Sequence, residues 1–132
     1  MIILAIDFGE KRFGLASADS KTEVALLLGE ISFSSLTEAK KELSKIIKEK
    51  GASTLVFGLP LSFKFEETPI CGKIRRFALE AEKEFGVKIA FVNEVLTTEM
   101  AKKLNQSTKN KDSTSAMIIL QDYLTRLKEH GR

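Results

Sequence analysis

The order of segments in this chain predicts an α/β fold with a mixed five-stranded sheet, in which two parallel strands extend three antiparallel strands and helices flank the sheet. Two observations support this prediction. Three extended segments follow one another across short turns within residues 1–33, which favours antiparallel pairing. Helical and apolar extended segments then alternate, as they do where crossover helices connect parallel strands.

The first third of the chain is predicted to form strands. Residues 2–7 are an apolar run that ends on Asp7, and residues 8–11 have the composition of a turn. Residues 12–18 alternate between apolar and polar side chains, and residues 23–33 form a third extended segment.

The next segments carry helix signals. Ser35 and Glu38 have the spacing of a capping box, and Gly51 is typical of a helix end, so the first helix is expected between them. A second helix is expected from Thr68-Pro69 to Gly86. The remaining expected segments are a strand at 54–57 ending at 58–60, a strand at 87–92, a short helix after residue 97 or 98, a mobile polar loop at 105–111, and a last helix at 112–128.

Composition limits the function classes. A chain of 132 residues with 43% hydrophobic side chains is expected to form a single domain, 1–132. Cys71 is the single cysteine, so we expect neither an internal disulfide nor a zinc site. No apolar run is long enough to cross a bilayer, so we expect a cytoplasmic protein without a membrane partner. The net charge of +3 is compatible with a polyanionic partner, and the sequence leaves a monomer or a weak dimer open.

Three acidic residues lie at the edges of predicted elements. Asp7 ends the first apolar run, Glu94 follows the last one across Asn93, and Asp112 opens the final helix. Carboxylates that meet repel one another unless cations hold them, which suggests a site for Mg²⁺ or Mn²⁺. The alternative is that these acids only solvate the surface, with Asp112 acting as a helix cap. Asp19 is a further candidate ligand, but its position at the far end of the second strand favours a turn or surface role.

The segment from Asp7 to Ala16 contains an acid, a glycine turn and a returning strand with Gly14. Such a hairpin lets a ligand approach the backbone closely. It is similar both to the phosphate-holding hairpin of actin-like and Hsp70-like ATPases and to the first hairpin of ribonuclease H-like nucleases. The ATPases resemble two such domains, whereas this chain has one copy, although a nucleotide-binding fragment remains an alternative.

Four segments together resemble the YqgF-type pre-16S rRNA nuclease family, also described as Holliday-junction-resolvase-like. These segments are 6–16, 56–61, 92–98 and 111–121. The resemblance implies a ribonuclease H-like fold and a metal-dependent nuclease that hydrolyses phosphodiester bonds in structured RNA, in 5′-end processing of precursor 16S ribosomal RNA. Two alternatives stay open, namely a Holliday-junction-type resolvase acting on branched DNA and a catalytically weak nucleic-acid-binding protein.

The resemblance also assigns residues. The family's metal-binding acids fall on Asp7, Glu94 and Asp112, which would hold Mg²⁺ or Mn²⁺ and carry out catalysis. Nucleic acid would be contacted by Gly9, Lys11, Arg12, Lys109 and Lys111, although Gly9 and Gly14 can equally serve only to shape the hairpin.

The chain departs from the family pattern at two places. Asn93 and Val95 replace an acid and an arginine, which motivates the binding-only alternative. Residues 62–67 replace a usually glycine-rich stretch. Phe63 and Phe65 in that stretch flank Lys64 and can either stack on unpaired bases or pack in the core or the loop; packing is the favoured interpretation.

Overall fold

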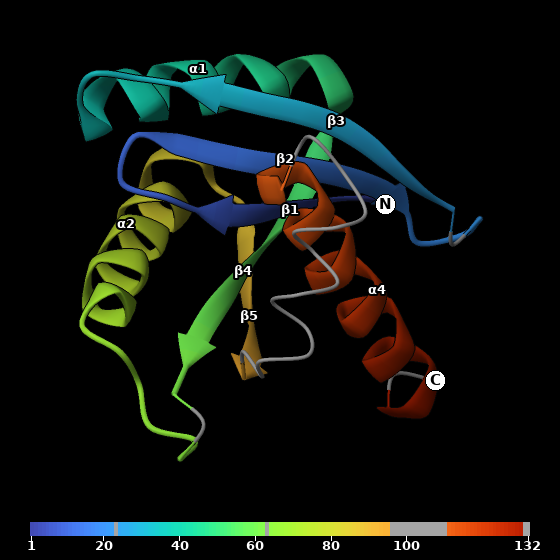
Figure 1. Cartoon of the computed structure of the whole chain (residues 1–132). Helices are drawn as coiled ribbons and strands as arrows, with labels where there is room; N and C mark the ends of the chain where they lie inside the picture. The colour runs from blue at the N-terminus through green and yellow to red at the C-terminus, as the bar shows by residue number, and fades with distance from the viewer. Residues whose placement is uncertain (23, 63, 96–110, 131–132) are drawn as a thin grey trace.

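A computed structural model of the chain describes residues 1–22, 24–62, 64–95 and 111–130 (Figure 1). Its five strands form one sheet in the order β3-β2-β1-β4-β5, with β1, β2 and β3 antiparallel and β1, β4 and β5 parallel. This confirms the predicted mixed sheet. The strands are β1 (Ile2–Phe8), β2 (Arg12–Asp19), β3 (Ala25–Ser32), β4 (Ala52–Leu61) and β5 (Lys88–Val95).

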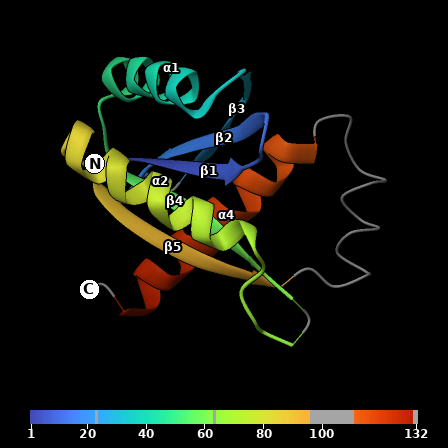
Figure 2. The same ribbon diagram turned by 90° about the vertical axis from the view of Figure 1, so that its left-hand side faces the viewer.

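Helices cover both faces of the sheet. Helices α1 (Leu36–Lys50) and α2 (Ile70–Phe85) lie on one face, and α4 (Lys111–His130) crosses the other (Figures 1 and 2). Alternate residues of β1 belong to different cores: Leu4 and Ile6 pack with α1 and α2, whereas Ile3 and Ala5 pack with α4. This alternation places Asp7 on the α4 face of the sheet.

The parallel strands are longer than the sequence indicated. Strand β4 continues through Gly58 and Pro60 to Leu61, and β5 runs past Val92, so that Pro60 pairs with Glu94. Beyond Phe57 the pairing of β4 with β1 ends, and β5 is the one named strand that pairs with it in the described sheet. Proline has no backbone N–H and cannot donate a hydrogen bond to a neighbouring strand. It is tolerated in a strand where one side has no pairing strand. The end at Leu61 lies one residue beyond the end predicted at 58–60. The end expected at residue 92 was wrong, because β5 continues to Val95.

The predicted helix ends are confirmed. Ser35 caps α1 by accepting a hydrogen bond from the Glu38 N–H at 3.2 Å, and Gly51 ends the helix with φ of 69°. Gly86 ends α2 with φ of 64°. The short helix expected after residue 97 and most of the loop expected at 105–111 lie outside the described residues. In the part of the chain that the structure describes, no helix is long and apolar enough to cross a membrane.

Gly58 allows α4 to pack closely on the sheet. A Cβ atom at this position would lie 2.5 Å from Ile119 Cδ1 and 2.9 Å from Ile119 Cγ1, and both distances are too short for real contacts. Ile119 is itself only 3% exposed, so it has little room to move. The absence of a side chain at Gly58 therefore sets how close the middle of α4 comes to β4.

We expect Gly58→Ala to reduce the free energy of unfolding by roughly 1–3 kcal/mol, because the added methyl group overpacks this contact. Gly72→Ala is the matched control, since a Cβ at Gly72 in α2 meets nothing within 4 Å. It should be neutral or stabilise by up to about 1 kcal/mol through helix propensity. Urea unfolding measures the free energy of unfolding of both variants. Adding Ile119→Val to Gly58→Ala should recover part of the lost stability. Equal effects of Gly58→Ala and Gly72→Ala on stability would contradict this packing.

Candidate functional site

The parallel strands bring Asp7 and Glu94 to one edge and one face of the sheet. Glu94 follows Val92 by two residues, and Val92 packs in the core under α4, so Glu94 also lies on the α4 face. Between these two strands, β4 carries Gly58, opposite Val92. A Cβ there would lie 3.7 Å from Glu94 Cγ, so the glycine keeps the space between the two acids open.

The carboxyl group of Glu94 is held in an unfavourable environment. Burial is the largest cause that raises its pKa from 4.5 to about 7, followed by a hydrogen bond to the Asp122 carboxyl and the negative charge of Asp122. The charge of Asp7 raises the pKa further, and the Arg126 guanidinium lowers it. Among the described residues, Glu94 Oε1 is buried and has no hydrogen-bond partner. A buried carboxylate oxygen of this kind is suited to bind a cation.

Asp122 of α4 is a member of this cluster that sequence reasoning missed. It faces Glu94, and its Oδ2 accepts a 3.5 Å hydrogen bond from Arg126 Nη2. A signal was present, because Asp122 follows the buried Ile119 by three residues and so lies close to the face that α4 turns to the sheet. The described cluster thus contains the carboxylates of Asp7, Glu94 and Asp122.

The third predicted ligand, Asp112, lies in the first turn of α4, and its side chain is outside the described part of the structure. Figure 2 shows that α4 begins on the side towards which β1 points. Among the described side chains, no group of three or more His, Cys, Asp or Glu is arranged to hold a metal ion. Convergence of Asp112 with Asp7 and Glu94 therefore stays a prediction.

The β1–β2 hairpin carries three of the predicted nucleic-acid contacts. A Cβ at Gly9 would lie 2.5 Å from the carbonyl oxygen of Arg12, so this glycine is needed to shape the turn. Lys11 is exposed, and Arg12 extends beside Glu30 with an Nε–Oε2 distance of 3.9 Å. Lys109 is outside the described residues, and Lys111 begins α4 with an undescribed side chain.

Asp19 lies at the opposite end of the hairpin, where it pairs with Ile2. Its Oδ1 accepts a 2.9 Å hydrogen bond from the Lys21 N–H and lies 3.6 Å from the amino terminus. The backbone hydrogen bond lowers the pKa of this carboxyl group. The structure places Asp19 far from Asp7 along β1, in agreement with the turn role expected for it.

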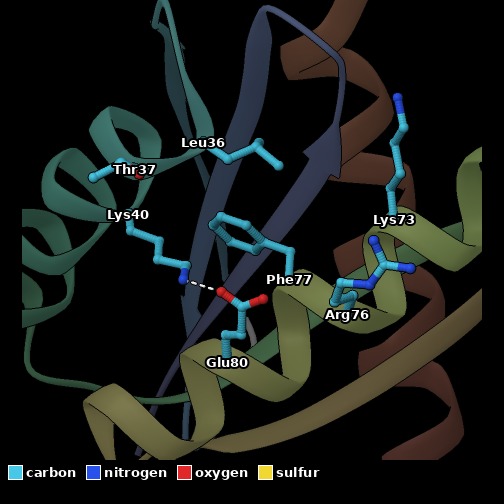
Figure 3. Close-up of a pocket in the computed structure, with 7 residues that line it drawn as sticks. All are labelled: Leu36, Thr37, Lys40, Lys73, Arg76, Phe77 and Glu80. Atoms are coloured by element: carbon cyan, nitrogen blue, oxygen red, sulfur yellow. Dashed lines mark hydrogen bonds and ion pairs between the residues drawn. The ribbon is translucent and has the colours of Figure 1, made fainter.

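A cleft between α1 and α2 lies on the other face of the sheet (Figure 3). Its lining includes the ring of Phe77 and the charged side chains of Lys40, Lys73, Arg76 and Glu80. Lys40 forms an ion pair with Glu80, and the hydrogen bond between them raises the pKa of Lys40. Lys73 also forms an ion pair, with 3.4 Å between its Nζ and Glu10 Oε1. Two of its cations are thus already paired with carboxylates, and the cleft is separated by the sheet from Asp7 and Glu94.

The sheet order, the helices on both faces and the acid on the first strand define a ribonuclease H-like fold. The RuvC structure from T. thermophilus in complex with a Holliday junction substrate superposes with a TM-score of 0.68 at 13% identity, covering 98% of this chain and 97% of that one. The fowlpox virus resolvase in complex with Holliday junction DNA gives a TM-score of 0.55 at 15% identity, covering 96% of this chain and 99% of that one.

The chain belongs to the RuvX family, described as Holliday junction resolvase, which matches residues 1–126. Relatives named "Putative pre-16S rRNA nuclease" are similar over nearly the whole chain. The one from Anaplasma marginale is 34% identical and covers 98% of this chain and 87% of the relative. The one from Bordetella pertussis is 34% identical and covers 96% of each. The family resemblance drawn from the four sequence segments is confirmed.

The raised pKa of Glu94 predicts a pH-dependent stability. Between pH 4.5 and about 7 the folded state binds more protons at Glu94 than the unfolded state, so the free energy of unfolding falls as pH rises through this window. Without screening, the raised pKa would lower the free energy of unfolding by on the order of 3 kcal/mol across this window. Solvent screening of this half-buried group reduces the change to roughly 1–2 kcal/mol. In chelator, Glu94→Gln should therefore be more stable than wild type at pH 8 and equally stable at pH 4.5.

Urea unfolding at the two pH values measures this difference, and the exposed Glu49→Gln on α1 is the matched control. Glu49→Gln should leave the pH dependence of wild type unchanged. A Glu94→Gln variant that is less stable than wild type at pH 8 would contradict the strained burial of this carboxylate.

Proposed function

We propose that this protein is a metal-dependent nuclease that hydrolyses phosphodiester bonds in structured RNA, in 5′-end processing of precursor 16S ribosomal RNA. The observation that carries the proposal is the half-buried Glu94 carboxylate, whose Oε1 has no described hydrogen-bond partner and which lies close enough to Asp7 to feel its charge. Family membership and the names of the relatives support the substrate class.

The donors at this edge of the sheet fit a hard divalent cation. Asp7 and Glu94 supply carboxylate oxygens, and their mutual repulsion is the kind that Mg²⁺ or Mn²⁺ relieves. We propose that Asp112 completes the ligand set from the first turn of α4, where the helix dipole favours its ionised form. When bound, such ions activate water and neutralise charge that develops on the phosphoryl and leaving oxygens.

The chain's own residues position the substrate around these acids. Lys11 and Arg12 extend from the turn that follows β1, where their charges can contact phosphate. Lys109 and Lys111 would add contacts near the start of α4. Gly58 keeps side-chain atoms out of the space beside Glu94.

Two alternatives each rest on one observation. The solved structures of RuvC and of the fowlpox resolvase are complexes with Holliday junctions, which supports a branched-DNA substrate as the second candidate. The family's usual acid and arginine are replaced by Asn93 and Val95, which supports a catalytically weak binding protein. Cleavage assays on precursor rRNA fragments and on four-way DNA junctions, run side by side, separate the three.

We expect Asp7→Asn to abolish cleavage while leaving the fold intact, because the amide keeps the shape of the side chain and removes a charge that the metal needs. Wild-type activity should require Mg²⁺ or Mn²⁺, and Ca²⁺ should bind but support little turnover. Both activating ions should raise the thermal midpoint of wild type more than that of Asp7→Asn. Asp19→Asn is the matched control, since Asp19 lies at the opposite end of β1.

Cleavage by Asp7→Asn at the wild-type rate, or full wild-type activity in excess chelator, would rule out this mechanism. A wild type that binds structured RNA without cleaving it would favour the binding-only alternative.

We expect binding to structured RNA to weaken with salt. The double change Lys109→Ala, Lys111→Ala should lower the slope of log affinity against log salt by roughly 2 if each lysine contacts one phosphate. The control is Lys45→Ala, Lys48→Ala on α1, on the far side of the sheet. Filter binding over a salt series measures the slopes; equal slopes for wild type and the Lys109/Lys111 variant would show that these lysines only solvate the chain.

A further inference from the structure

Phe65 is displayed to solvent in a conformation that few residues adopt. Its side chain is 75% exposed, the largest exposure among the large hydrophobic residues that the structure describes as exposed. It also has φ of 65°, and within the described ranges it is the one residue other than glycine with a positive φ. For a bulky L-residue this is an outlier that calls for a reason. The interpretation favoured from sequence, packing in the core or the loop, is wrong for Phe65, because three quarters of its side chain is exposed.

The loop that carries Phe65 is held by Ser62. The Ser62 carbonyl oxygen accepts a 2.8 Å hydrogen bond from the Phe65 N–H, and the Ser62 N–H donates to the Glu66 carbonyl oxygen at 2.8 Å. The Ser62 hydroxyl oxygen accepts from the N–H groups of Lys64 at 3.2 Å and Glu66 at 3.3 Å. Four hydrogen bonds to one serine fix the backbone on both sides of the exposed ring.

The ends of the loop are also fixed to the fold. Leu61 and Glu67 form an antiparallel bridge, and the Glu67 carboxylate accepts hydrogen bonds from the Arg75 guanidinium at 2.7 and 3.1 Å. The Thr68 hydroxyl donates to the Pro60 carbonyl oxygen at 2.7 Å. The backbone position of Phe65 is therefore set by the sheet and by α2.

The loop leaves the sheet beside the candidate site. It follows β4 directly, and the last residues of β4 pair with the segment of β5 that contains Glu94: Pro60 lies opposite Glu94, and Leu61 lies opposite Val95. Figure 1 shows the loop extending from the end of β4, next to the end of β5. The other strongly exposed apolar side chains of the sheet, Leu26 and Leu27, belong to β3 at the opposite edge.

We propose that Phe65 is a stacking platform for an unpaired nucleobase of the substrate, close to the phosphodiester that occupies the Asp7–Glu94 site. The inference rests on the proposed nuclease function. A solvent-exposed ring on a fixed backbone suits this role, since every base has a face on which it can stack. The adjacent exposed Lys64 adds a charge for the phosphate of the same nucleotide.

This role makes the substrate preference specific. A base inside a continuous duplex is stacked on its neighbours and is not available to Phe65, whereas a base in a loop, at a strand end or at a branch point is available. Phe65 would therefore favour cleavage next to unpaired nucleotides. Removing the unpaired base from the substrate while keeping its sugar and phosphate should abolish the affinity that the Phe65 ring contributes.

A tryptophan at position 65 provides a direct probe, because the chain contains no tryptophan. We expect the fluorescence of Phe65→Trp to be quenched by an RNA hairpin with an unpaired loop, and much less by the same sequence as a blunt duplex. Leu26→Trp on β3 is the matched control, exposed at the other edge of the sheet, and should report no quenching by either RNA. Equal quenching of Phe65→Trp by both RNAs would overturn the proposal.

Affinity separates stacking from a structural role. Phe65→Ala should weaken binding to the hairpin by roughly 5- to 150-fold, with an unchanged salt slope, and should bind the abasic hairpin as wild type does. Phe65→Gly should lose the same affinity while its thermal midpoint stays level or rises, because glycine adopts the positive φ readily. Phe65→Tyr should retain binding.

The outcomes distinguish this inference from the proposed function. Loss of less than 2-fold in affinity by Phe65→Ala, with Asp7-dependent cleavage intact, would overturn the stacking role and leave the nuclease in place. Loss of affinity only in parallel with a lower thermal midpoint in both Phe65→Ala and Phe65→Gly would assign Phe65 to the fold and also overturn the proposal. No binding of either RNA by wild type would overturn both proposals.

Discussion

The proposed metal site depends above all on the burial of the Glu94 carboxylate beside Asp122 and Asp7. A carboxyl group whose pKa is raised to about 7 is a net cost to the folded state at neutral pH. A leucine or glutamine at this position would give a more stable folded protein. A buried carboxylate of this kind therefore indicates a functional role. We propose that a divalent cation at the unpartnered Oε1 and the neighbouring Asp7 offsets this cost.

The fold creates this cluster through details of β4 and α4. Pairing of β4 with β5 through Pro60 and Leu61 carries Glu94 beyond the point where β1 stops pairing with β4. Gly58 lets Ile119 reach the sheet, and the same close approach brings Asp122 to Glu94. A side chain at position 58 would move α4 outwards and weaken both contacts, so the packing of the fold and the electrostatics of the site share one residue.

The sequence was sufficient for the sheet because its signals are local: the alternation in β2, the Ser35 cap and the Gly51 and Gly86 stops each act within a few residues. It failed at the end of β5, where Asn93 resembles a turn residue and only pairing with β4 makes it extended. Asp122 was missed because its role arises from helix-to-sheet packing. Phe65 was assigned to packing because neither its exposure nor its positive φ can be deduced from composition.

An NMR titration of the Glu94 side-chain carboxyl carbon, with and without saturating Mg²⁺, tests most directly whether this buried carboxylate binds a cation. We expect a pKa of about 7 in chelator and a value below the ordinary 4.5 with Mg²⁺, because a bound cation stabilises the charged form. A pKa that stays near 7 in Mg²⁺ would show that the cation binds elsewhere. A pKa near 4.5 in chelator would show that burial and the neighbouring acids do not destabilise the charged form of Glu94.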